Sequence, residues 1–169
     1  MDASTRLEIA RGQIVTARQY TESLLADIDP GDWFQQPAEV ATHVAWQVGH
    51  LAMAQYGLVM FRQRGRQTED TELMSSRFRK QFSKGSQPES VVADNCSVEE
   101  IQTVFNNVYR QAMKELEQYP VEQLDDPVDQ PYAAYPTKYG ALLFCAHHEM
   151  LHAGQIGLLR RLLGKSPVR

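Results

Sequence analysis

Residues 137–163 read TKYGALLFCAHHEMLHAGQIGLLRRLL, and this stretch decides the class of fold. Thr137 is a favourable N-cap because its hydroxyl can accept a hydrogen bond from the first helical turn. Gly164 follows the last apolar residue, as is typical of a helix end. The apolar pattern has none of the period-two alternation of a strand. A helix over 137–163 spans roughly 40 Å at 1.5 Å per residue, a length typical of helical bundles.

Three more helices are predicted upstream, over about 5–28, 38–63 and 97–119. The first opens at a capping box of Thr5 and Glu8, and the third opens at a second box of Ser97 and Glu100. A proline terminates the first and the third, because proline cannot continue the helical hydrogen-bond ladder. The positions that we expect to be buried are Leu7, Ala10, Ile14, Ala17, Thr21, Leu24 and Ile28 in the first helix, and Ile101, Val104, Phe105, Val108, Ala112, Leu116 and Tyr119 in the third.

The connection between the second and third helices, residues 65–96, is too long for a hairpin. The predicted fold is therefore all-α, a four-helix bundle with a long crossover between helices 2 and 3, in one domain over residues 1–169. We interpret the basic residues in and around this crossover as a solvated surface rather than a phosphate site. They are Arg62, Arg64, Arg66, Arg77, Arg79, Lys80 and Lys84.

Composition narrows the classes of partner. The 169 residues include 17 Lys and Arg against 21 Asp and Glu, a net charge of -4 that gives no attractive field for nucleic acid. No apolar run reaches membrane-spanning length, and the first residues lack the features of a signal peptide. We therefore expect a cytoplasmic protein whose two cysteines, Cys96 and Cys145, are free thiols, since they match no disulfide framework or zinc ribbon.

His148 and His152 are four residues apart, which places both imidazoles on one helical face, one turn apart. Two ligands in this arrangement can share one metal ion. The stretch from His148 to His152 also fits H-E-x-x-H, in which the glutamate of zinc peptidases acts as general base. A third ligand is expected downstream in such a peptidase, yet no Glu, Asp or His follows His152. A hydrolase of this type remains the alternative interpretation.

The third ligand must then come from the second helix, which offers His43 and His50. These two residues are about 10.5 Å apart along a helix axis, too far to bind the same ion. His50 lies near the middle of its helix, as do His148 and His152, whereas His43 lies in the first two turns. The position of each histidine along its helix therefore favours a three-histidine metal site of His50, His148 and His152. We assign His43 and His147 no role at the metal.

Three stretches of the chain together resemble the DinB/YfiT-like superfamily of metal-dependent enzymes: Asp32-Trp33 to Pro37, Trp46-Gln47-Val48-Gly49-His50-Leu51-Ala52, and His148 to Ile156 with Leu159, Arg160 and Arg161. In that family, a histidine of a W-x-x-x-H-L-A-like second helix joins two histidines of an H-x-x-x-H-x-G-Q-I fourth helix on a divalent metal. The resemblance implies His50, His148 and His152 as ligands, the same three that spacing and depth select.

Three neutral nitrogen ligands leave an open coordination position, which is typical of a catalytic site. Zinc is our first choice, and imidazole also suits nickel, iron or manganese. The resemblance implies a thiol-dependent S-transferase that uses a low-molecular-weight thiol such as bacillithiol or mycothiol on an electrophilic small molecule. It also implies a homodimer. The alternatives are a metal-dependent hydrolase that activates water and a non-enzymatic metal-binding stress protein.

Two residues near the predicted ligands require separate interpretation. Cys145 precedes His148 by three residues and is expected to be a buried, apolar-like side chain rather than a ligand or nucleophile. Glu149 is expected to be a surface carboxylate, the alternatives being an acceptor that orients a ligand imidazole or a general base. Trp33 and Trp46 are expected in the core or in a pocket wall. Gly49, Gly154 and Gly157 are expected where helices 2 and 4 approach each other closely.

Overall fold

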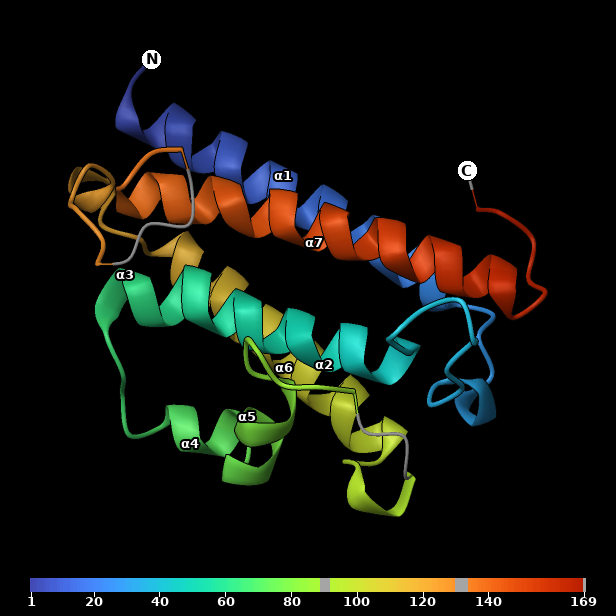
Figure 1. Ribbon diagram of the computed structural model, residues 1–169. Coiled ribbons are helices and arrows are strands. Elements are labelled where there is room, and N and C mark those ends of the chain that lie inside the picture. Colours follow the sequence, from blue (N-terminus) through green and yellow to red (C-terminus); the bar gives the residue numbers. More distant parts are fainter. Residues whose placement is uncertain (89–91, 130–133, 169) are drawn as a thin grey trace.

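The computed structural model describes residues 1–88, 92–129 and 134–168, which form helices and no β-strand (Figure 1). The predicted four-helix bundle is confirmed. Its long helices are α1 (Ala3–Leu25), α2 (Val44–Gln55), α6 (Val98–Glu117) and α7 (Lys138–Leu162). α2 continues without a break into the π-helical segment η2 (Tyr56–Phe61) and the short α3 (Arg62–Arg64). The remaining short elements are η1 (Pro30–Asp32), α4 (Asp70–Leu73), α5 (Ser76–Phe82), η3 (Val92–Asp94) and η4 (Val121–Gln123).

The long helices form two packed pairs. α1 and α7 run side by side in the same direction, and α2 and α6 pack together and run in the opposite direction (Figure 1). Because α2 and α6 are parallel, the chain must return along the bundle before α6 begins. The predicted crossover makes this return through α4 and α5, with residues 89–91 lying outside the described part.

One apolar cluster fills the space between the helices. Every position of the first predicted helix that the sequence predicted as buried is buried, from Leu7 to Ile28, and so are the α6 positions from Ile101 to Leu116. Tyr119, which follows the end of α6, is only partly buried against the cluster. Within the described residues, no helix is both long and apolar enough to cross a membrane.

Two of the predicted helix starts are confirmed. The hydroxyl of Ser97 accepts from the backbone N–H of Glu100, and that of Thr137 accepts from the N–H of Gly140. The first helix begins earlier than predicted, because Asp2 is its N-cap and accepts from the N–H of Thr5 at 2.8 Å.

The start predicted for the second helix was wrong. α2 begins at Val44 rather than after Pro37. His43 is its N-cap, with Nδ1 accepting from the backbone N–H of Trp46 at 3.1 Å, and this bond provides the first turn with an acceptor. His43 therefore has a capping role and is fully buried away from solvent.

Gly49 makes a close contact, but with the crossover rather than with α7. A Cβ at Gly49 would lie 2.5 Å from the ring of Phe82, so only glycine lets α5 pack directly on α2. The expectation for the other two glycines was wrong. A Cβ at Gly154 would meet nothing within 4 Å, and one at Gly157 would make ordinary contact with Leu24 of α1 at 3.9 Å.

Candidate metal centre

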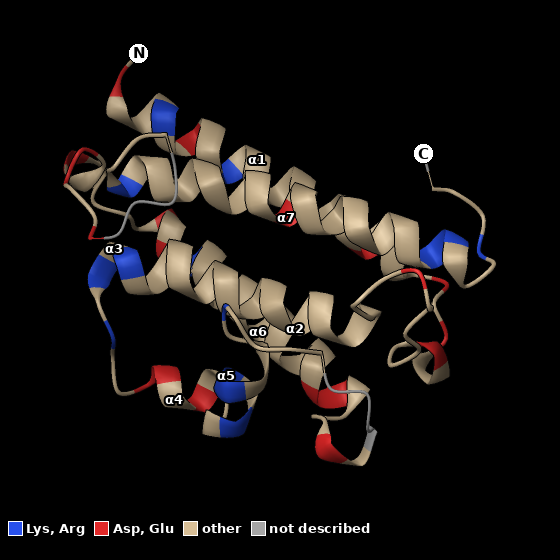
Figure 2. Cartoon of the chain, viewed as in Figure 1, with Lys and Arg blue, Asp and Glu red and all other residues tan. Residues whose placement is uncertain are grey.

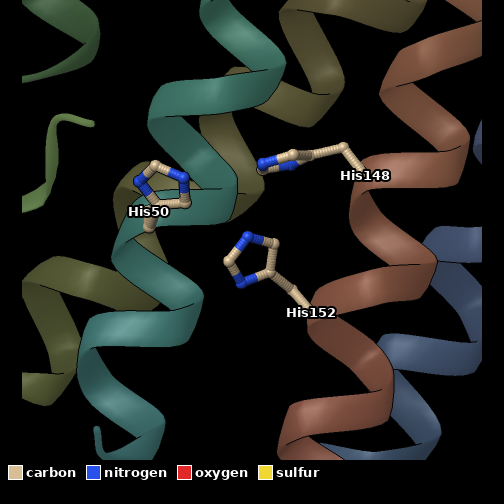
Figure 3. A group of neighbouring side chains, drawn as sticks. All are labelled: His50, His148 and His152. Atoms are coloured by element: carbon tan, nitrogen blue, oxygen red, sulfur yellow. The ribbon is translucent and has the colours of Figure 1, made fainter. Parts of the chain in front are cut away.

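Three imidazoles converge between α2 and α7. His50 comes from α2, and His148 and His152 come from successive turns of α7 (Figure 3). Their ring centroids are 4.5 to 5.4 Å apart, and one ligand nitrogen from each lies within 4.8 Å of the other two. Among the described residues, the structure thus brings together the three histidines that the sequence selected. Ligands of one tetrahedral zinc ion lie roughly 3.3 Å apart, so small side-chain rotations would suffice to bring these nitrogens onto one ion.

Hydrogen bonds fix the orientation of two of the three rings. His50 Nδ1 lies 2.8 Å from the backbone carbonyl oxygen of Phe82, and His152 Nδ1 lies 2.5 Å from Oε1 of Gln47. A carbonyl oxygen can only accept, so each Nδ1 carries the proton. In a neutral imidazole, Nε2 then has the free lone pair that a metal requires.

The amide of Gln47 is itself held in place. Its Nε2 donates to Oγ1 of Thr42 at 2.9 Å and to Oε1 of Gln155 at 2.8 Å. These two bonds leave Oε1 as the atom that faces His152. Gln47 is buried, so its amide has no competing water and the imidazole keeps one orientation.

The three imidazoles are electrically neutral near pH 7. Burial lowers the pKa of His148 to about 4, and the neighbouring His50 lowers it further. Burial also lowers the pKa of His152 to about 3, with contributions from His148 and His50. The pKa of His50 is lowered by burial too, and its bond to Phe82 partly opposes the shift. Since only neutral imidazole binds metal, this donor set fits a divalent cation.

Trp46 supports the site from one side. Its ring stacks on that of His50, with centroids 4.8 Å apart and planes 4° from parallel. The indole Nε1 donates to Oγ of Ser86 in the crossover at 3.1 Å. Trp46 is therefore part of the wall of the site, as expected, whereas Trp33 is buried in the core.

Glu149 does not lie at the surface, so that expectation was wrong. Its side chain is 3% exposed, and its Oε1 accepts from Nε of Arg18 on α1 at 2.8 Å. Arg18 also donates to the carbonyl oxygen of Phe105 and to Oε1 of Gln55. The carboxylate thus has its partner on α1, and Glu149 is absent from the group of donors that could share a metal ion.

The remaining predicted residues lie apart from the three nitrogens. Cys145 is buried, and burial raises the pKa of its thiol, so it packs as a neutral side chain as expected. Cys96 is also buried and free. His147 is exposed on the outer side of α7.

A pocket of about 390 Å³ opens beside the centre and has His50 and His148 in its wall. Much of the remaining lining is apolar and includes Met53, Leu58 and Phe144. A ligand in this pocket would lie directly against two of the three imidazoles.

Sequence reasoning missed the two acceptors that orient the rings. Gln47 lies three residues before His50, one turn away along the same helix, and this spacing was the available signal. Phe82 had no such signal, because it contributes a backbone carbonyl from a distant part of the chain.

Comparison with known proteins identifies the family and the fold of the chain. The family model of the DinB superfamily matches residues 13–156, which include all three histidines. The chain belongs to the DinB superfamily. Its fold is similar to the crystal structure of a conserved protein from Enterococcus faecalis, with a TM-score of 0.70 and 20% sequence identity over 94% of this chain and 97% of that one. A search of curated proteins gave no match.

Proposed function

We propose that this DinB-superfamily chain is a metal-dependent enzyme that transfers an electrophilic small molecule to the sulfur of a low-molecular-weight thiol. The observation that carries the proposal is the convergence of three neutral imidazoles, two of them with Nδ1–H held by an acceptor, beside a pocket. Three nitrogen donors leave room for a further ligand, as catalytic rather than structural zinc sites do. Zinc is the metal that we propose first.

A divalent cation held by His50, His148 and His152 would favour the deprotonated form of a coordinated thiol, which is the nucleophilic form. The protein residues supply orientation and exclusion of water. Trp46 covers one face of His50, and the apolar side chains of Met53 and Phe144 limit the water that reaches the thiol.

The transfer itself needs no redox partner. A bond forms between the sulfur and the electrophilic carbon while the bond from that carbon to its leaving group breaks. The thiol proton passes to solvent, and the leaving group departs with the electron pair. With monochlorobimane as the electrophile, the leaving group is chloride and the product is fluorescent.

This reaction gives a direct test. Protein purified without nickel resin is loaded with zinc and mixed with monochlorobimane and one of four thiols: glutathione, coenzyme A, bacillithiol or mycothiol. We expect conjugation above the rate of the thiol alone with at least one of them. His50→Ala should abolish the increase and bind metal at least ~100-fold more weakly. His147→Ala is the matched control, because His147 is exposed on α7 and should leave both quantities unchanged.

The same experiment can contradict the proposal. A fully metal-loaded protein that accelerates no conjugation with any of the four thiols would argue against a transferase. Turnover of esters without thiol would favour the hydrolase. Chelation that lowers the melting temperature, with no binding of small molecules, would favour a protein whose metal only stabilises the bundle.

The homodimer remains a prediction. The solvent side of α7 exposes four large apolar side chains, and we propose that a second copy of the chain covers them. Light scattering should give twice the mass of the chain, and Leu151→Glu, at the most exposed of the four, should shift the mass toward that of the monomer. The four exposed apolar residues of α7 are Met150, Leu151, Leu158 and Leu162.

A further inference from the structure

The pocket beside the metal centre lies along one face of α2 and of its π-helical continuation η2. The lining residues that follow His50 are three, four, seven and eight positions beyond it, close to the spacing of a single helical face. They are Met53, Ala54, Gly57 and Leu58. α2 itself contains no Lys, Arg, Asp or Glu, as Figure 2 shows. His50 therefore lies at one end of a largely apolar helix face.

α7 supplies a second wall through Phe144 and His148, which are one turn apart. The centroids of these two rings are 5.7 Å apart, and their planes are inclined by 56°. Phe144 is half-buried, and its ring thus provides an aromatic surface next to a predicted metal ligand. Among the described residues, the rest of the lining consists of Arg62, Ser83 and Lys84.

Two small residues leave the space that the pocket occupies. Ala54 and Gly57 are half-buried and lie about one turn apart on the face that follows His50. A Cβ at Gly57 would make an ordinary contact with Nη1 of Arg62, at 3.4 Å. The volume of about 390 Å³ is more than twice the ~150 Å³ in which benzene binds inside a protein core, so the pocket accommodates a planar group of about two fused rings.

We propose that this pocket binds a planar aromatic group of about two fused rings, with the electrophilic carbon attached to that group lying at the imidazoles. The inference rests on the proposed function and adds to it the class of electrophile. Aromatic groups suit this wall because they pack favourably on the ring of Phe144 and on the thioether sulfur of Met53. Ala54 and Gly57 are then specificity-determining residues, because they limit the size of the group that enters.

Two methyl ketones that do not react with thiols measure binding of the aromatic group by itself. Zinc-loaded protein is dialysed to equilibrium against 2-acetonaphthone, whose ultraviolet absorption gives the bound fraction, and acetone is added as a competitor. We expect 2-acetonaphthone to bind at least ~100-fold more tightly than acetone, because only its two fused rings bury a large apolar area.

Ala54→Leu adds bulk on the pocket side of α2 and should weaken the binding of 2-acetonaphthone by at least ~10-fold. Ala26→Leu is the matched control, because Ala26 is exposed and does not line the pocket. Phe144→Leu removes an aromatic ring without adding bulk and should weaken binding by about 2- to 10-fold. Zinc content and melting temperature should stay those of the wild type in all three variants.

The conjugation assay tests the same pocket with reactive molecules. Monochlorobimane contains two fused rings and iodoacetamide contains none, while in both cases the thiol sulfur displaces a halide from carbon. Ala54→Leu should lower kcat/KM for monochlorobimane by at least ~10-fold and leave that for iodoacetamide within about 2-fold of the wild type. The ratio of the two values within each variant cancels the intrinsic reactivity of each electrophile.

The outcomes separate this inference from the proposed function. Equal affinity of the wild type for the two ketones overturns the aromatic pocket, and so does tight binding of 2-acetonaphthone that persists in both pocket variants. Displacement of 2-acetonaphthone by the thiol that supports conjugation also overturns it, since the thiol would then occupy this pocket. Binding that Ala54→Leu weakens, with no conjugation for any thiol, supports the aromatic pocket and contradicts the transferase alone.

Discussion

Two neighbouring faces of α7 hold buried and half-buried polar groups of opposite character. On the side of α2, His148 and His152 are neutral, and their free nitrogens converge with that of His50. On the side of α1, Glu149 is charge-paired with Arg18, whose guanidinium lies 3.5 Å from the centre of the Phe105 ring and also donates to two oxygens. The two arrangements lie within five residues of one helix.

The difference separates a closed polar centre from an open one. Nε, Nη1 and Nη2 of Arg18 each donate to an oxygen atom of the protein, so this centre joins α1, α2, α6 and α7. The free nitrogens of the histidines converge on one another, and bringing three such acceptors together without a cation is unfavourable. The open centre is therefore where we expect chemistry, and the closed centre is where we expect stability.

The largest effect should come from breaking the closed centre. Arg18→Met leaves the Glu149 carboxylate buried without its partner and should lower the free energy of unfolding by about 3–5 kcal/mol, as measured by urea denaturation. Arg11→Met is the matched control on the same helix, because Arg11 makes a more exposed pair with Glu117 and should cost less than about 1 kcal/mol. Equal losses in the two variants would show that the buried pair has no special role.

An intermediate effect should come from loosening the open centre. Gln47→Leu removes the acceptor of His152 Nδ1–H, and metal affinity should fall by about 10- to 100-fold in competition with a chromophoric chelator. Gln47→Glu keeps an acceptor at the same place and should retain most of the affinity. If both variants bound metal like the wild type, the orientation of His152 would not depend on residue 47.

The smallest effect should appear in the pH dependence of the metal-free protein. The pKa of His148 is about 4 and that of His152 about 3 when folded, against about 6.5 for an unfolded histidine. The unfolded chain therefore binds more protons below about pH 6.5, and the free energy of unfolding falls as the pH falls. Each histidine should account for a loss of about 1 kcal/mol between pH 7 and 5.5.

Denaturant melts with chelator present at both pH values measure this loss. Replacing both residues, His148→Asn with His152→Asn, should flatten the dependence by the sum of the two contributions. If the free energy of unfolding of the double variant depended on pH as steeply as that of the wild type, other groups would be the cause of the loss and the two histidines would not contribute to it.

The open centre could be predicted from sequence, whereas the closed centre could not. The spacing of His148 and His152 fixes a shared helical face. The choice of His50 over His43 was confirmed, although it rested on a helix that begins earlier than α2 does. The spacing also shows that Glu149 points away from the face that the two histidines share, but it does not show which residue the carboxylate contacts. Its partner Arg18 lies on another helix, 131 residues away in the chain. Without that partner, a carboxylate next to a metal ligand was interpreted as a surface group.

The fold was predictable for a similar reason, and the errors of the prediction were local. Capping side chains at Ser97 and Thr137 act within a few residues, so they can be recognised in the sequence. The late start of α2 depends on an imidazole as N-cap, which is not among the usual capping residues. The π-helix at 56–61 has no recognisable sequence signal either, since its residues would suit an ordinary α-helix.

The contact between Gly49 and Phe82 limits how far this centre can be reduced in size. A designed pair of helices that copied α2 and α7 would contain every nitrogen of the site. It would lack the carbonyl oxygen of Phe82, and the ring of His50 would be free to turn. Transplanting the site into another scaffold therefore requires three pieces of backbone rather than two, the third being a short helix that contributes no ligand at all.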